Sequence, residues 1–154
     1  MKYIVSILAC ICCLATPMQV NAAETEGALS NTASSEEVTP AAAGLISSYS
    51  LGCSAGTKSL YVNAKTTASE EMSELGFIDI KIQRSSDLTT WTTEKTVSDK
   101  IKEDASIYSL ANYSVSVQGG YYYRVKLTHY AKEQGWFFPD DQSVTNTSNY
   151  VWIS

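Results

Sequence analysis

The stretch GGYYYRVKLTHY, residues 119–130, decides the fold class of this chain. The two glycines favour a turn, and the side chains that follow it alternate between two faces of the backbone. Arg124 and Lys126 lie on one face of the stretch. The opposite face consists of Tyr121, Tyr123, Val125 and Leu127. This period-two pattern is typical of a β-strand with one buried face and one solvated face.

The same alternation recurs from Gly44 to the end of the chain, with turn residues between the segments. It predicts strands at residues 45–51, 59–67, 77–84, 91–96, 106–117, 121–130 and 144–153. The side chains expected to face the core include Leu60, Val62, Ala64, Ile78, Ile80 and Ile82. About seven short antiparallel strands in about 110 residues is the number found in immunoglobulin-like β-sandwiches. The sequence therefore predicts an all-β fold.

Two segments between these strands are expected to form a turn and a short helix. Residues 52–56 contain two glycines and are expected to form a turn. Ser69 is a possible helix N-cap and Gly76 a possible stop, with Met72 and Leu75 on one side between them. This spacing predicts a short helix over residues 69–76.

The chain begins with the pattern of a secretory signal peptide. Lys2 precedes an apolar run of about 13 residues, and small residues at Val20 and Ala22 suit cleavage after Ala22. Residues 1–22 are thus expected to be a signal peptide and residues 23–43, which are poor in large apolar side chains, a flexible leader. The β-sandwich domain is expected over residues 44–154. The protein is expected to be secreted or extracellular, including loose association with the cell surface.

Charge restricts the partners that this chain can have. The sequence holds 16 acidic residues against 11 lysines and arginines, a formal net charge of −5, and loss of Lys2 with the signal makes it more negative. Because a polyanion repels such a chain, nucleic acid is not an expected partner. The apolar run of the signal is shorter than the roughly 20 residues of a spanning helix, so no membrane span is expected after cleavage.

Two segments of the domain resemble fibronectin type III-like modules. IKIQRSSD, residues 80–87, followed by Thr90-Trp91-Thr92, is similar to their strand, turn and tryptophan strand. GYYYRV, residues 120–125, resembles their penultimate strand, with Tyr121 in the place of the tyrosine corner. Residues 44–153 also resemble a small family of secreted Gram-positive bacterial proteins of unknown function. The resemblance implies a single immunoglobulin-like or fibronectin type III-like β-sandwich, and transfers no catalytic or binding residue.

The sequence offers little reactive chemistry. His129 is the only histidine, no G-x-S-x-G nucleophile elbow is present, and His129 and Cys53 have no metal-ligand spacing. His129 is interpreted as a strand-end histidine bonded to a backbone group or water. We therefore expect no enzyme activity, no catalytic residue, no metal and no cofactor.

Cys53 is the one cysteine outside the predicted signal, which takes Cys10, Cys12 and Cys13 with it. The favoured interpretation is a small buried side chain near a strand end. The alternative is an intermolecular thiol that links two copies, so a monomer or a weak dimer is expected.

The candidate recognition site lies in the segment that joins the last two strands. Trp136, Phe137 and Phe138 are three consecutive aromatic residues there, with Tyr130 beside them. They either form an exposed recognition patch or fold back to plug the open end of the core. Trp91 and Trp152 are interpreted as packing residues of the core or of a sheet face.

Three functions remain open from the sequence. The first is surface recognition of a protein at the bacterial envelope by a secreted, non-enzymatic β-sandwich. The second is binding of a carbohydrate or cell-wall glycan by the same loop aromatics. The third is a structural or self-associating role, with Cys53 forming the bond between two copies.

Overall fold

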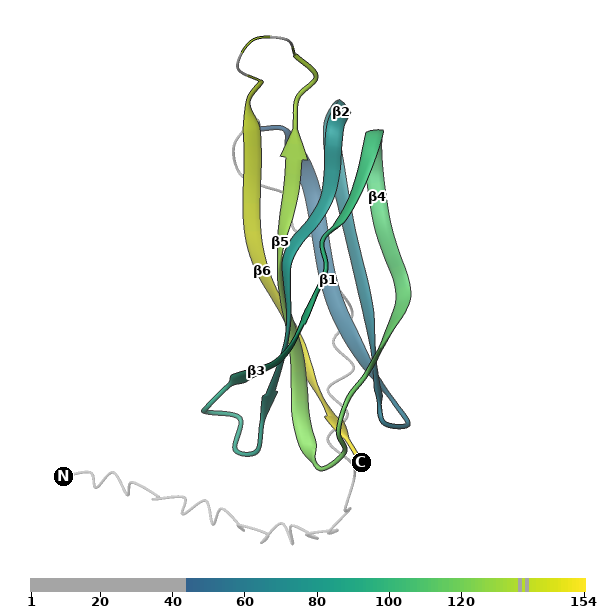
Figure 1. Cartoon of the computed structure of the whole chain (residues 1–154), viewed down its shortest axis with the longest axis vertical. Helices are drawn as coiled ribbons and strands as arrows, with labels where there is room; N and C mark the ends of the chain where they lie inside the picture. The colour runs from purple at the N-terminus through teal and green to yellow at the C-terminus, as the bar shows by residue number, and fades with distance from the viewer. Residues whose placement is uncertain (1–43, 136, 138) are drawn as a thin grey trace, which may run out of the picture.

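The computed structural model describes residues 44–135, 137 and 139–154, and these form a curled antiparallel β-sheet (Figure 1). Its six strands are β1 (Ile46–Gly56), β2 (Ser59–Ser85), β3 (Thr92–Val97), β4 (Lys100–Ser116), β5 (Tyr121–Lys132) and β6 (Asp141–Ile153). The described residues contain no helix, so the all-β prediction is confirmed. All six strands belong to one hydrogen-bonded sheet. The immunoglobulin-like or fibronectin type III-like form of the fold stays a prediction.

Strand β2 organises the sheet, because it pairs with four of the other five strands. Its first half pairs with β1, and its second half pairs with β5 and β3. Strand β4 pairs with β2 from Ser59 to Phe77, so it runs beside both halves. Strand β6 completes the order by pairing with β5.

The predicted helix over residues 69–76 is wrong, because this segment continues β2. The register of β2 against β4 shifts between Thr67 and Met72, and this irregularity lets both Met72 and Leu75 turn inward. The i, i+3 spacing of two apolar residues therefore came from an irregular strand and not from a helix. Gly76 is needed for close strand packing, since a Cβ there would collide with the backbone oxygen of Lys100.

Continuity of β2 also explains why the structure has six strands and not seven. The predicted strands at residues 59–67 and 77–84 are the two halves of one 27-residue strand. The turn predicted over residues 52–56 is wrong as well, since these residues belong to β1. The chain reverses immediately afterwards at Thr57 and Lys58, where Lys58 adopts a left-handed φ of 51°.

The inner face of the curled sheet holds the core, to which every strand contributes. Among the predicted core residues, Leu60, Val62, Ala64, Ile80 and Ile82 are buried. Ile78 is only half-buried, which corrects its prediction. The register of β2 against β5 shifts between Ile78 and Lys81, and Asp79 has a φ of 53°. This shift changes the alternation, so Phe77 occupies the buried position in place of Ile78.

Side chains join β1 to β6, which lie at opposite ends of the strand order. Asn149 Oδ1 accepts the backbone N–H of Cys53 at 3.0 Å, and Asn149 Nδ2 donates to the backbone oxygen of Cys53 at 3.0 Å. Nearer the start of β1, Gln142 Oε1 accepts the N–H of Ile46 at 2.9 Å. We call this contact, formed by Asn149 and Gln142, the β1–β6 seam. It satisfies edge groups of β1 that would otherwise need water or another strand.

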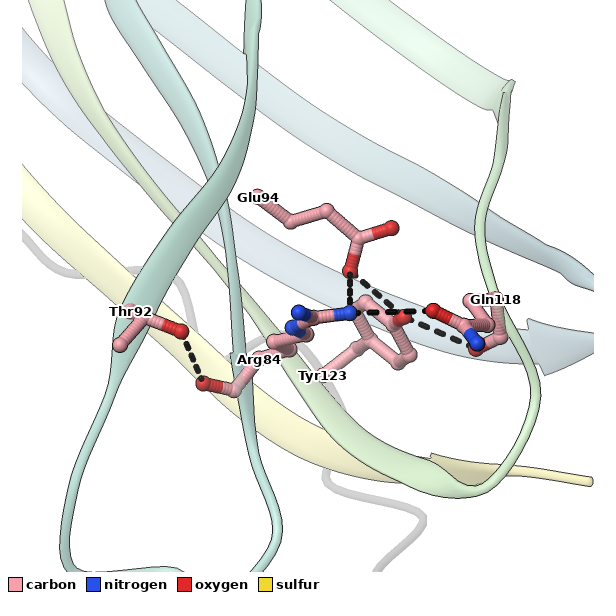
Figure 2. A network of polar contacts seen from close by, with 5 residues as sticks. All are labelled: Arg84, Thr92, Glu94, Gln118 and Tyr123. Carbon is pink, nitrogen blue, oxygen red and sulfur yellow. Dashed lines mark hydrogen bonds and ion pairs between the residues drawn. The ribbon is translucent and has the colours of Figure 1, made fainter.

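A polar network around Tyr123 holds β3 against the loop between β4 and β5 (Figure 2). The Tyr123 hydroxyl lies 2.7 Å from Glu94 Oε2 and 2.8 Å from the backbone oxygen of Gln118. Arg84 Nη1 lies 3.5 Å from Glu94 Oε2 and donates to Gln118 Oε1 at 3.2 Å. Burial of the ring, followed by its bond to Glu94, raises the pKa of Tyr123 to about 12. Tyr123 thus bonds a backbone oxygen through its hydroxyl, while Tyr121, the residue in the place of the tyrosine corner, lies under the Arg84 guanidinium.

Candidate functional site

Four aromatic side chains gather on the outer face of the sheet near the start of β5. Tyr122 pairs with Trp152 across β5 and β6, and the neighbouring outward position of β5, Arg124, pairs with Tyr150. The alternation that sends Tyr123 and Val125 into the core sends these side chains outward. Trp91, in the loop between β2 and β3, lies over the same place. We call Trp91, Tyr122, Tyr150 and Trp152 the aromatic strip.

The rings of the aromatic strip touch in sequence. The centroids of Tyr122 and Trp152 are 4.8 Å apart, and those of Tyr122 and Tyr150 are 6.0 Å apart, both in edge-to-face geometry. The centroids of Tyr150 and Trp91 are 6.4 Å apart at a tilt of 46°. Trp152 is 44% exposed and the other three rings are half-buried. Mutual packing therefore fixes the rings while leaving part of their surface open to a ligand.

Arg124 lies within the aromatic strip and is held in a fixed orientation. Its guanidinium carbon is 4.2 Å from the centroid of the Trp91 ring, a cation–π contact. Its Nε donates to Gln83 Oε1 at 2.9 Å. Partial burial of the guanidinium lowers the pKa of Arg124. No ion pair joins Arg124 to a carboxylate within the described part of the chain.

A compact turn at Asp87 positions Trp91. One carboxylate oxygen, Asp87 Oδ1, accepts the backbone N–H groups of Thr89 and Thr90 at 2.9 and 2.8 Å. It also accepts the hydroxyl of Ser85 at 2.9 Å. These bonds stabilise the ionised form and hold the pKa of Asp87 below its usual range. The Trp91 Nε1–H then donates to the backbone oxygen of Leu88 at 3.2 Å, which fixes the indole beside the turn.

Two lysines extend the same face along the sheet. Lys81 of β2 pairs directly with Lys126 of β5, one outward position beyond the pair formed by Gln83 and Arg124. Lys126 is exposed and Lys81 is half-buried. We call Lys81, Arg124 and Lys126 the basic cluster. The outer face of β2, β5 and β6 thus combines partly exposed rings with adjacent positive charges.

The recognition loop predicted from the sequence lies at the other end of β5. Phe137 is 86% exposed, whereas Trp136 and Phe138 lie outside the described residues. Tyr130 is half-buried and pairs with Gly76 and Ser143, four outward positions along β5 from Tyr122. Burial, followed by the charge of Glu74, raises the pKa of Tyr130. The structure therefore separates this loop from the aromatic strip.

Cys53 lies on the inner side of β1 and is buried. Its Sγ is 3.2 Å from the backbone oxygen of Asn149 and 3.4 Å from the hydroxyl of Ser148. Burial raises the pKa of the thiol to about 11, with the bond to Ser148 acting in the opposite direction. A thiol in this setting stays protonated near neutral pH and is shielded from a second chain.

His129 is fully buried on the inner face of β5. Its Nδ1 is 2.8 Å from the Thr66 hydroxyl, a side-chain partner that the interpretation of the sequence did not include. Its ring packs against Tyr49 and Phe77 at centroid distances of 4.9 and 5.5 Å. Burial lowers the pKa of His129 to about 4. The surroundings are those of a packed core histidine.

Sequence reasoning missed the aromatic strip, although part of its signal is visible. Alternation places Tyr122 and Arg124 on the solvated face of the strand at 121–130. Tyr150 and Trp152 are also two residues apart, so they share one face of the last strand. The interpretation of Trp152 as a sheet-face residue is consistent with its position, but its exposure was not expected. The contribution of Trp91 depends on the Asp87 turn and on strand register, which a single sequence does not supply.

Comparison of the chain with protein-family models, with curated proteins and with solved structures found no match in any of the three. Within residues 44–135, 137 and 139–154, no group of three or more His, Cys, Asp or Glu side chains is arranged to hold a metal ion. The same residues include no helix that could cross a membrane.

Proposed function

We propose that this protein is a secreted, non-enzymatic recognition protein that binds carbohydrate through the aromatic strip. The observation that carries the proposal is the row of partly exposed rings formed by Trp91, Tyr150, Tyr122 and Trp152 on the outer face of the sheet. Aromatic faces stack on the apolar faces of sugar rings, and polar groups beside them fix the sugar hydroxyls. Gln83 and Arg124 supply such groups at the centre of the strip.

The rigidity of the face supports this function. The rings rest on paired strands, and the Asp87 turn fixes the one that comes from a loop. A pre-organised surface loses little conformational entropy when it binds a ligand. Binding at a glycan surface outside the cell or at the envelope also agrees with the predicted signal peptide.

The test is affinity electrophoresis of the full chain in gels that contain neutral or acidic polysaccharides. We expect at least one polysaccharide to retard the protein and Trp152→Ala to abolish the retardation. Ile107→Ala is the matched control, because Ile107 is a 50% exposed apolar residue of β4, on the far side of β2 from β5. Equal retardation of the wild type and Trp152→Ala, or no retardation by any polysaccharide, would refute the proposal.

A second candidate function is recognition of a protein partner by the loop between β5 and β6. The 86% exposed Phe137 favours it, since a large aromatic side chain in water is suited to a partner's apolar pocket. Capture of a partner from envelope extracts that is lost in Phe137→Ala, and kept in Trp152→Ala, would favour this candidate. A self-associating role through Cys53 has less support, because the thiol is buried.

A further inference from the structure

The basic cluster is unusual for a chain with this overall charge. The sequence has 16 acidic residues against 11 lysines and arginines, yet three of the cations lie together on the face of β2 and β5. The ion pairs found in the described residues are Arg84 with Glu94 and Lys132 with Glu74. Neither pair involves Lys81, Arg124 or Lys126. The chain therefore keeps a local positive field on one face.

Arg124 is the best-defined anion-binding group of this cluster. Its Nε is occupied by Gln83, and its plane lies against Trp91, so the side chain cannot turn freely. A guanidinium presents its N–H groups in a planar fork that matches the two oxygens of a carboxylate. Partial burial of a cation costs free energy that a bound anion offsets.

We propose that the ligand of the aromatic strip is a polysaccharide whose sugars carry carboxylate groups. This inference depends on the proposed carbohydrate function and specifies the substrate class. The sugar rings stack on the strip, with a carboxylate paired to Arg124. Lys126 is two residues further along β5, about 7 Å from Arg124. Together with Lys81, it faces the adjacent sugars of the bound polysaccharide.

An acidic polysaccharide fits this face better than single-stranded nucleic acid, which also combines rings with negative charge. Nucleic acid carries one phosphate per nucleotide and is bound by extended positive grooves. Here the basic cluster has three residues, and the net charge of the protein repels a dense polyanion. A polysaccharide with sparse carboxylates matches both the aromatic strip and the basic cluster, because its sugars stack on the rings and its carboxylates pair with the cations.

The experiment compares acidic polysaccharides with their own uncharged derivatives. Hyaluronan, gellan and glucuronoxylan, in which uncharged sugars separate the carboxylates, are each titrated into the full chain beside their carboxyl-reduced forms, with binding followed by calorimetry. The variants are Trp152→Ala, Arg124→Gln and Lys126→Gln. Lys102→Gln is the matched control, since Lys102 is an exposed lysine of β4 on the opposite side of β2. A single-stranded oligothymidylate is titrated in parallel.

We expect at least one of the acidic polymers to bind more tightly than its reduced form. Arg124→Gln should weaken that binding about tenfold or more, because it removes a charge-assisted bidentate bond. Lys126→Gln, which changes an exposed side chain outside the core, should weaken it about two- to fivefold. Raising sodium chloride from about 0.05 to about 0.5 M should also weaken it. Lys102→Gln should bind as the wild type does.

Three outcomes overturn the inference in distinguishable ways. Equal binding of the acidic and reduced polymers, with both lost in Trp152→Ala, would leave the carbohydrate function standing and refute the requirement for carboxylates. Absence of binding to every polymer would refute both proposals. Tighter binding of oligothymidylate than of any polysaccharide, with the same loss in Arg124→Gln, would assign the face to nucleic acid.

Discussion

His129 shows how one residue can couple the stability of this core to pH. Its ring is fully buried, Thr66 bonds Nδ1, and Nε2 has no hydrogen-bond partner among the described residues. The neutral ring fits this site, because a protonated ring would place a charge between Tyr49 and Phe77. The pKa is accordingly lowered from 6.5 to about 4.

We expect the free energy of unfolding to fall as the pH drops through the interval between these two values. Below pH 6.5 His129 is mostly protonated in the unfolded chain, whereas in the folded chain it stays neutral until about pH 4. The loss from this group should be about 2 kcal/mol at pH 5 relative to pH 7. Urea unfolding at the two pH values measures it, with His129→Gln as the comparison.

In His129→Gln the difference between pH 7 and pH 5 should shrink by about the same 2 kcal/mol, because the glutamine amide does not titrate. An NMR titration of the wild-type ring provides an independent check. A His129 pKa near 6.5 in the folded protein would contradict the expectation.

Cys53 should be unreactive in the folded protein. Its thiol is buried, and its pKa of about 11 leaves very little thiolate at neutral pH. We expect iodoacetamide to label Cys53 only after denaturant is added, as measured by mass spectrometry of the peptide that contains it. Rapid labelling of the native protein, or a disulfide-linked dimer through Cys53 on non-reducing electrophoresis, would contradict this.

At the scale of the elements, the Asn149 side chain makes two hydrogen bonds of the β1–β6 seam, beside the one made by Gln142. Asn149 bonds both the N–H and the backbone oxygen of Cys53, as a neighbouring strand would. Asn149→Ala should lower the free energy of unfolding by about 1–3 kcal/mol, because both backbone groups lose their partner in a partly buried place. Chemical denaturation measures the change.

Asn146→Ala is the control for this seam, since among the residues that the structure describes the Asn146 side chain accepts a bond only from the next one, Thr147. The control should cost clearly less than Asn149→Ala. Equal costs for the two variants would show that the Asn149 bonds add no stability of their own.

The loop between β2 and β3 determines where Trp91 lies. Asp87→Ala removes the carboxylate that accepts the N–H groups of Thr89 and Thr90. We expect the indole N–H resonance of Trp91 to shift and broaden in this variant, and polysaccharide binding to weaken with it. Asp87→Asn keeps one acceptor oxygen and should change less. An unchanged Trp91 resonance in Asp87→Ala would show that the turn does not position the indole.

The elements also show what the sequence can specify. Alternation correctly predicted the interior of the strands at Leu60, Val62, Ile80 and Ile82, because a half-buried strand imposes a period of two. It failed at residues 69–76, where a register shift in β2 mimicked a helical spacing. It also failed at Ile78, where Asp79 changes the phase. Such irregularities depend on contacts with partner strands that local sequence does not encode.

Prediction of the site was limited for a related reason. The sequence pointed to Trp136, Phe137 and Phe138 because these aromatic residues are consecutive. The residues of the aromatic strip come from one loop and two strands, and only pairing between β5 and β6 brings them together. A site assembled across strands requires the register, which the sequence alone does not determine.

At the scale of the whole molecule, the two aromatic surfaces can be tested against each other. Phe137 follows the end of β5, whereas Tyr122 lies at its beginning, so a change in one surface should not disturb the other (Figure 1). We expect Phe137→Ala to retain wild-type affinity for polysaccharide and Trp152→Ala to lose it, as measured by the same electrophoresis. The reverse pattern would assign carbohydrate binding to the loop between β5 and β6.

The length of β2 has a consequence for how the chain is made. Its second half acquires its neighbour β5 only after residues 121–132 have been synthesised, long after β1 and the first half have become able to form a hairpin. Until then Phe77, Ile80 and Ile82 have no β5 to cover them, and an apolar ribbon is exposed to other nascent chains. Full pairing of β2 therefore waits until the C-terminal segment from Tyr121 onward has been synthesised.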